Sequence, residues 1–273
     1  MKTKQQELNE LFTQWRKSNP NKPFSCDGFL TEAEDNCVLF IGVESNTGNT
    51  NIVVCDPLTI TCEECKTKSE FWLYYRGFSK GHDNEYKSPK DEVYYGAYLL
   101  NAISTKSYTG DIKDLKKRFG NELVQRAIDG KSTDCDISTV GIWLVSTAKG
   151  VLKRQKNAIT LFMEKMGNEQ GAVAYMNLSK FGGGSVADKE KLDENVKAMK
   201  DTIIEEIKII DPMLIVVCGV NKTKPIFDKH FKTEDFYTKT VGIRHLTFYT
   251  EANIREVAQS EKVQNIVIKV LAK

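Results

Sequence analysis

The feature that most constrains the fold is an apolar run at residues 38–41, which stops at Gly42 and is followed by Glu44 and small polar residues. A short, unbroken apolar run bounded by turn residues is typical of a strand covered on both faces, as in a parallel sheet. Ligands of open parallel sheets bind beyond the carboxyl ends of such strands. The pattern therefore predicts an α/β fold and makes residues 41–48 the first place to look for a binding site.

Two later apolar runs and one extended segment repeat this pattern. Residues 171–178 form an apolar run with Asn177 near its end. Residues 213–219 form another that ends in glycine, and a less regular segment at residues 240–250 contains His245. Helical patterns separate the runs, so right-handed crossovers place the carboxyl ends of the strands on one edge of the sheet. We expect a three-layer α/β/α sandwich with a central, mostly parallel four-stranded sheet.

Apolar residues spaced three and four positions apart predict helices at both ends of the chain and between the strands. An amphipathic helix is expected over residues 3–18 and a long one over residues 186–210, where Pro212 stops the pattern. A basic helical segment follows at residues 221–230, and a terminal helix begins near Ser260. These helices supply the layers that cover the sheet.

No internal repeat or low-complexity linker divides the chain, so a single domain spanning residues 1–273 is expected. Residues 104–135 are highly charged and helical in pattern, which is typical of a peripheral insertion. Residues 137–145 fit a strand or an extended segment that leads into a helix over residues 155–166.

Composition and charge exclude several classes of protein. No apolar run approaches the roughly 20 residues that span a bilayer, and residues 1–7 lack the hydrophobic region of a signal peptide. The net charge of +2 is too small for a polycation, although basic residues are grouped at residues 113–118, 149–156 and 222–224. Such groups either form a footprint for a phosphate backbone or are solvated helix faces. We expect a monomeric cytoplasmic protein without membrane contact.

The seven cysteines do not point to a metal centre. Cys62 and Cys65 have the spacing of a metal-ligand pair, but no second close pair completes a set of four ligands. A disulfide framework is not expected in a chain without an export signal. We therefore expect buried or incidental thiols and no bound metal.

Glu44, Asn177 and His245 each lie at or near the carboxyl end of an expected parallel strand. A carboxylate, an amide and an imidazole that converge on one crevice can combine acid–base chemistry with recognition of a ligand. Each residue also has an ordinary role by itself, as a helix cap, a turn residue or a buried histidine. A glycine-rich stretch at residues 182–184, before a helix expected to open at Ser185, favours an anion. It matches neither a P-loop nor a dinucleotide fingerprint, so ATP and NAD have no support.

Three short motifs carry a resemblance to a known family. They are Gly42-Val43-Glu44-Ser45-Asn46, Asn177-Leu178-Ser179-Lys180 and His245-Leu246-Thr247. In this order, over roughly residues 37–250, they resemble the motifs of the uracil-DNA glycosylase superfamily. The family patterns are Gly-x-Asp/Glu/Ala/Asn-Pro, Asn-x-x-Lys and His-Pro-Ser. This chain departs from them because no proline follows Glu44, and neither proline nor serine follows His245.

The resemblance implies hydrolysis of the N-glycosidic bond of a flipped uracil or other damaged base in DNA, without a metal or organic cofactor. By position, Glu44 orients the attacking water, His245 hydrogen-bonds the departing base, and Asn177 reads the base edge. Phe71 or Trp72 stacks on the base. The residues expected to bind flanking phosphates are Gly42, Ser45, Asn46, Ser179, Lys180, Gly182, Gly183, Gly184, Ser185 and Arg244.

Two other functions fit the same residues. The first is a catalytically inactive member of the same fold that binds DNA, RNA or a modified nucleotide. The absence of these prolines favours this alternative, because in active members of the family they shape the turns that compress DNA. The second is an unrelated α/β hydrolase or transferase that acts on a small nucleotide, since a fold does not determine a function.

Overall fold

The computed structural model of the chain separates into two compact units. The first, called the sheet unit, comprises Met1–Arg76 and Arg154–Lys273, and the second, called the helical unit, comprises Gly77–Lys153. Within the described residues, no helix has an apolar stretch long enough to cross a membrane. The structure describes residues 2–18, 28–46, 89–106, 108, 111–183 and 189–271.

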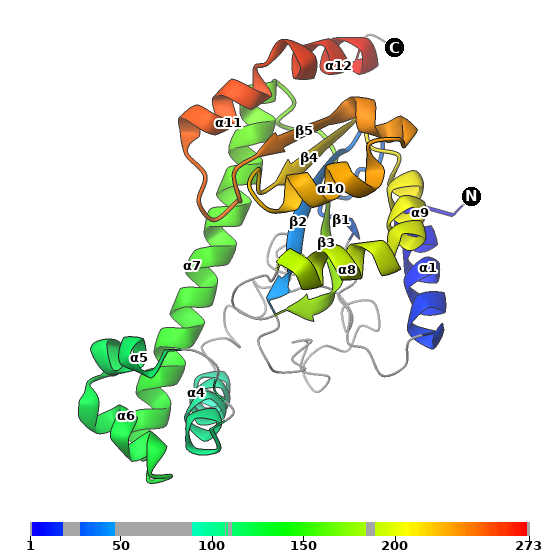
Figure 1. The fold of residues 1–273 in the computed structure, drawn as a ribbon. Helices are drawn as coiled ribbons and strands as arrows, with labels where there is room; N and C mark the ends of the chain where they lie inside the picture. The colour runs from blue at the N-terminus through cyan, green and yellow to red at the C-terminus, as the bar shows by residue number, and fades with distance from the viewer. Residues whose placement is uncertain are drawn as a thin grey trace. The chain divides into compact units, whose positions relative to one another are not determined.

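The sheet unit is built on a five-stranded sheet (Figure 1). Its strands are β1 Gly28–Phe29, β2 Val38–Asn46, β3 Val173–Gly183, β4 Leu214–Cys218 and β5 Thr240–Ile243. Their order is β1-β3-β2-β4-β5, with β1 antiparallel to β3 and every other pairing parallel. The α/β class and the mostly parallel sheet are confirmed, but the sheet has one strand more than predicted. β1 is so short that no apolar run marks it in the sequence.

The parallel strands are buried and share one register. Residues 38–42 and all of β4 are buried, as strands between two covered faces require. Ile41 pairs with both Met176 and Val217, and Val217 pairs in turn with Gly242. These four residues, called the central row, mark the same height in the four parallel strands.

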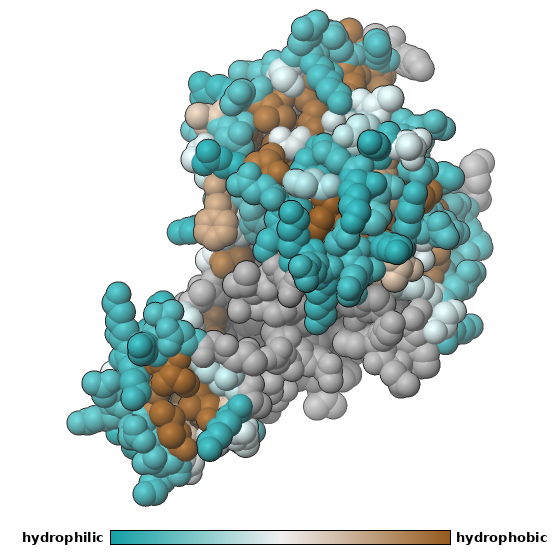
Figure 2. All heavy atoms as spheres, in the orientation of Figure 1, coloured by the Kyte–Doolittle hydropathy of each residue, from teal (hydrophilic) through white to brown (hydrophobic). Residues whose placement is uncertain are grey.

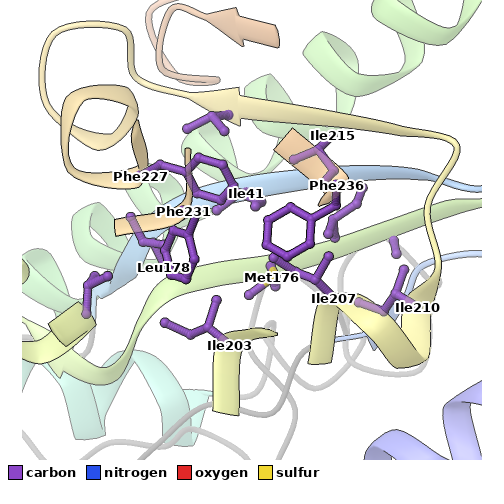
Figure 3. Close-up of a cluster of buried hydrophobic side chains, with 14 of the residues drawn as sticks. Ile41, Met176, Leu178, Ile203, Ile207, Ile210, Ile215, Phe227, Phe231 and Phe236 are labelled. Carbon is purple, nitrogen blue, oxygen red and sulfur yellow. The ribbon is translucent and has the colours of Figure 1, made fainter. Parts of the chain in front are cut away.

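One face of the sheet is covered by four helices and a short 3-10 helix. They are α1 Lys4–Ser18, α8 Lys189–Ala198, α9 Lys200–Ile210, α10 Thr223–Phe231 and η2 Asp235–Lys239. Their apolar side chains form one buried cluster with the strands. Figure 3 shows Phe227, Phe231 and Phe236 beside Ile41 and Met176 in this cluster. Burial of this surface, at about 25 cal/mol per Å², holds the helices on the sheet.

The helix predicted over residues 186–210 is two helices, α8 and α9, with a break at Met199. Periodicity found the buried face but not the break, since neither glycine nor proline marks it. Pro212 follows the end of α9, as predicted. The predicted apolar stripe is buried throughout: Leu192, Val196, Met199, Ile203, Ile207 and Ile210.

The opposite face of the sheet packs against α7 (Asp134–Met166), whose residues 154–166 belong to the sheet unit. Phe162 of α7 meets Phe40 of β2 edge to face, with ring centroids 5.5 Å apart. Residues 137–145 also belong to this helix, so the predicted strand or extended segment is wrong. A short apolar run fits a helix as well as a strand, and periodicity alone does not separate them. Two helices follow β5, namely α11 Glu251–Ala258 and α12 Glu261–Leu271.

The helical unit contains the first part of α7 and three shorter helices, α4 Pro89–Ser104, α5 Ile112–Phe119 and α6 Asn121–Ile128. The helices α4 and α7 approach closely at Gly96, where an added Cβ would come within 3.0 Å of the Ile137 carbonyl oxygen. The predicted insertion at residues 104–135 lies inside this unit. The buried core is formed by Leu100, Ile103, Leu115, Leu123, Val124, Ala127 and Val140.

Candidate functional site at the carboxyl edge of the sheet

The three residues predicted to form a site lie at the same edge of the sheet. Asn177 is one residue beyond the central row in β3, and Glu44 is three residues beyond it in β2. His245 is three residues beyond the row, in the turn after β5. At about 3.3 Å per residue, all three lie within roughly 10 Å of that row on its carboxyl side. The strand spacing of about 4.8 Å separates β3 from β5 by roughly 14 Å.

The strand order identifies where a ligand fits along this edge. From β2 the chain goes outward to β3, then crosses back over β2 to reach β4 and β5. The reversal between β2 and β4 is a topological switch point, and ligands of open α/β sheets bind in the crevice at such a point. A ligand at this switch point would have Asn177 on one side and His245 on the other.

Asn177 is a buried amide whose orientation is set by Tyr175, two residues earlier on the same face of β3. The Tyr175 hydroxyl donates to Asn177 Oδ1 at 3.2 Å. An amide has two N–H donors and two lone pairs on its oxygen, and this bond uses one of those lone pairs. Sequence reasoning missed Tyr175, although a tyrosine two positions before the polar residue of an otherwise aliphatic strand was a usable signal.

Gly42 pairs with Asn177 across β2 and β3 and makes room for this hydrogen bond. A Cβ at position 42 would lie 2.9 Å from Asn177 Oδ1 and closer still to the Tyr175 hydroxyl, distances that real Cβ atoms essentially never show. Gly42 is also buried. Gly42 was predicted to contact a DNA phosphate; in the structure its role is instead to leave room for the Tyr175–Asn177 hydrogen bond.

His245 is a partly buried imidazole whose tautomer follows from a backbone hydrogen bond. The Thr247 N–H donates to His245 Nδ1 at 3.2 Å, so Nδ1 is an acceptor and the neutral ring carries its proton on Nε2. Burial lowers the pKa of His245 from its ordinary value of 6.5. At pH 7 His245 is therefore neutral and presents an Nε2–H donor.

Phe248 is a large apolar side chain that is 73% exposed beside His245, and sequence reasoning missed it. The centroids of the two rings are 6.0 Å apart. The Phe248 N–H donates to the His245 carbonyl at 2.8 Å, which closes the turn that carries both rings. An exposed aromatic ring is a surface on which a base can stack. The sequence signal was an aromatic residue three positions after the candidate histidine.

Lys180, predicted to bind a phosphate, is completely buried instead. Its Nζ lies 2.6 Å from Glu206 Oε2 of α9, with both side chains at 0% exposure, and 5.9 Å from the ring centroid of Phe12. The predicted phosphate contact is wrong because Lys180 follows Met176 and Leu178 on the face of β3 that enters the core. Lys180 is part of the interior of the sheet unit.

The other β3 residues predicted to contact a phosphate are also part of the folded interior or of the sheet. Ser179 is fully buried, and its Oγ accepts a hydrogen bond from Asn195 Nδ2 at 3.3 Å. Gly182 and Gly183 continue β3 instead of forming a loop, and Gly183 pairs with Asn46 of β2. The backbone of Gly182 and Gly183 is therefore part of the sheet.

For Glu44, the structure describes only the backbone, which pairs with Ser179. Arg244 is exposed next to His245, and its predicted phosphate contact stays a prediction. Its backbone N–H donates to Asn253 Oδ1 at 3.2 Å, which ties the turn to α11. The other predicted residues that lie outside the described part of the chain are Phe71, Trp72, Gly184, Ser185, and the side chains of Ser45 and Asn46.

The described residues include no group of three or more His, Cys, Asp or Glu side chains arranged to hold a metal ion. Cys37, just before β2, and Cys218, in β4, are buried, and burial raises the pKa of Cys37 to about 12. Such thiols act as small apolar side chains. The predicted metal-spaced pair, Cys62 and Cys65, lies outside the described residues.

No protein-family model, curated protein or solved structure matches this chain. The structure establishes the α/β architecture and the positions of Asn177 and His245 at one edge of the sheet. The glycosylase-like fold and activity implied by the motifs remain predictions.

Proposed function

We propose that the carboxyl edge of the sheet binds a nucleotide flipped out of DNA and hydrolyses its N-glycosidic bond. The observation that carries this proposal is the neutral His245, whose Nε2–H donor stands at the same edge as the Asn177 amide. Negative charge develops on a carbonyl oxygen of a departing base. A preorganised donor in a partly buried site stabilises that charge.

Each group has one part in the proposed reaction. The bond between the sugar C1′ and the base nitrogen breaks with its electron pair leaving on the base, while a water oxygen bonds to C1′. Glu44 orients this water and accepts its proton, and its negative charge favours the cationic sugar. His245 donates to the base oxygen, and the base takes up a proton from solvent after release.

The amide and the exposed ring account for binding of the base. Asn177 offers both a donor and an acceptor, which matches a base edge that presents a carbonyl beside an N–H group. Tyr175 holds the amide in one orientation, so the site prefers one pattern of donors and acceptors. Phe248 is exposed and takes the stacking role that the sequence assigned to Phe71 or Trp72.

The test measures release of uracil, hypoxanthine and alkylated bases from oligonucleotides that each carry one modified base. His245→Ala should lower the rate about 10²- to 10³-fold, the loss expected when one donor to a developing anion is removed. The matched control is His230→Ala, which removes an imidazole that pairs with Asp193 at 2.7 Å between α8 and α10. The control should leave base release unchanged. Equal rates for His245→Ala and the unaltered protein would remove His245 from the chemistry.

A second function is supported by the missing prolines after Glu44 and His245. In that case the same edge binds a nucleotide of DNA or RNA without cleaving it. The unaltered protein would then release no base from any of the oligonucleotides but would still bind them. His245→Ala and Tyr175→Phe would weaken this binding.

A further inference from the structure

The helical unit carries a basic surface that takes no part in the site at the sheet edge. α5 exposes Lys113, Lys117 and Arg118 and leaves Lys116 half-buried, and these four residues are called the α5 basic face. Figure 2 shows hydrophilic side chains gathered over α5. The sequence left two interpretations of this group open, a phosphate footprint and a solvated helix face.

Among the described residues, no acidic side chain pairs with the α5 basic face. In the described part of the chain, none of its four side chains lies within ion-pair distance of a carboxylate. In the same unit Arg126 pairs with Asp136, and in the sheet unit Lys229 pairs with Asp193. Lys113 and Lys117, one helical turn apart, repel each other. A bound polyanion would offset this repulsion.

The helix dipole does not explain the whole group. Cations in the last turn, such as Lys116, Lys117 and Arg118, interact favourably with the negative end of the helix. Lys113 lies in the first turn, where the positive end of the dipole disfavours a cation. Asp111 at the N-cap and Asp114 share this first turn with Lys113, so the dipole alone does not account for the position of Lys113.

Arg118 is held in a defined orientation by Trp143 of α7. The guanidinium carbon lies 4.4 Å from the centroid of the Trp143 ring, and Phe119 meets the same ring edge to face at 5.4 Å. A guanidinium stacked on a ring keeps the N–H groups along its edge directed outward, where they can bind a phosphate through two parallel hydrogen bonds. Arg118 is thus preorganised to bind two oxygens of one phosphate group.

The direction of the apolar side of α5 favours a nucleic acid over a membrane surface. Leu115 is buried in the core of the helical unit, and Ile112 and Phe119 pack against the same core. A helix that binds a bilayer must present its apolar face outward to the lipid. On α5 that face is already used inside the unit, so only the charges are available to a partner.

We propose that the α5 basic face binds the phosphate backbone of a nucleic acid, as a second contact surface in addition to the sheet edge. This inference rests on the nucleic-acid partner of the proposed function, but not on the cleavage of any bond. The contact is independent of sequence, because it involves charge and phosphate geometry alone.

The test compares Lys113→Ala/Lys117→Ala with the control Lys131→Ala/Lys153→Ala, which removes two exposed lysines from elsewhere in the helical unit. Binding of an undamaged DNA duplex is measured by fluorescence anisotropy across a salt series. The α5 variant should bind about tenfold more weakly at low salt, and its plot of log K against log salt should be shallower by about 1.8. The control should bind nearly as tightly as the unaltered protein. Arg118→Lys should lose an intermediate amount of affinity, because it keeps the charge but not the two parallel N–H donors of the guanidinium.

Three outcomes would overturn the inference. Equal losses in the two double variants would mean that only net charge matters. Unchanged binding in the α5 variant would remove α5 from the contact. Binding to phosphatidylserine vesicles that depends on Lys113 and Lys117, without a matching effect on DNA, would assign the surface to membranes. Because the DNA is undamaged, none of these results depends on whether His245 supports base release.

Discussion

The two units use polar side chains in opposite ways. At the carboxyl edge of the sheet unit, Thr247 determines the tautomer of His245, and Tyr175 orients Asn177. On α5 of the helical unit, three of the four basic side chains are exposed, and none of the four has an acidic partner among the described residues. Buried, oriented groups discriminate between ligands, whereas exposed charges add affinity that falls with salt. Recognition and affinity should therefore respond to different substitutions.

The two units also differ in how deeply their ion pairs are buried. The Lys180–Glu206 pair of the sheet unit is at 0% exposure on both sides. In the Arg126–Asp136 pair of the helical unit, the arginine is 41% exposed and the aspartate 4%. Hydrogen bonds from Arg126 hold the pKa of Asp136 well below its usual range. A fully buried pair is costly to break, because removing one partner leaves a charge in the core.

The largest expected effect is that of Lys180→Ala, which should lower the free energy of unfolding by about 3–5 kcal/mol, as measured by chemical denaturation. The double variant Lys180→Met/Glu206→Leu should recover most of this loss, since apolar side chains of similar size replace a buried pair with little cost. A loss below about 1 kcal/mol for the single variant would mean that water reaches the pair in solution.

The next largest effect is expected for Gly42→Ala, which forces a methyl group into the Tyr175–Asn177 hydrogen bond. It should lower the free energy of unfolding by about 1–3 kcal/mol, as overpacking of a core does. The matched control is Gly150→Ala in α7, where an added Cβ meets nothing within 4 Å. The control should stabilise the protein by about 0.5–1 kcal/mol, because alanine is the better helix former. Similar effects for both would show that position 42 is not crowded.

Tyr175→Phe should cost about 1 kcal/mol of stability, since it removes one buried hydrogen bond to Asn177. Its main consequence is expected in recognition, because Asn177 Oδ1 then loses the donor that helps to orient the amide. Base release or nucleotide binding should become less selective among uracil, hypoxanthine and alkylated bases. If the order of preference is unchanged, Asn177 is oriented by other contacts.

The smallest effect is the contribution of His245 to the pH dependence of stability. Burial lowers the pKa of folded His245 below 6.5, so on acidification the unfolded chain binds a proton before the folded one does. The free energy of unfolding therefore falls as the pH drops below 6.5, and it stops falling once the pH is below the lowered pKa of folded His245. Unfolding of the unaltered protein and of His245→Gln, compared across this range, isolates the contribution. A loss of the same size in both would mean that His245 titrates normally.

Much of the fold could be predicted from local patterns. Three of the four parallel strands were found because each is buried and therefore reads as an unbroken apolar run, whereas β5 was predicted from a less regular extended segment. The two-residue β1 and the break at Met199 were missed, since neither leaves a mark in composition or in spacing. Residues 137–145 were misassigned because a short apolar run does not distinguish a buried helix from a strand.

The site was predictable only in part. Asn177 and His245 were found from their place at the ends of strands, and both lie at the carboxyl edge. Lys180 was assigned to a ligand because a lysine near a candidate site resembles a phosphate contact, yet its side chain enters the core. Phe248 and Tyr175 were missed because their roles depend on neighbours that are brought together by the turn and by the pleat.

By itself the sequence determined where the buried strands lie and which polar residues stand near their carboxyl ends. The reason is that a buried strand appears as an apolar run, and the residues that follow the run can be read directly from the chain. Only the tertiary structure decided which of those polar residues face a possible ligand and which face the core. The physical reason is that adjacent side chains of a strand point to opposite faces. Neighbouring positions such as Asn177 and Leu178 therefore differ, because Leu178 enters the buried cluster under the helices whereas Asn177 bonds to Tyr175 on the other face. The helices that cover Leu178 come from distant parts of the chain.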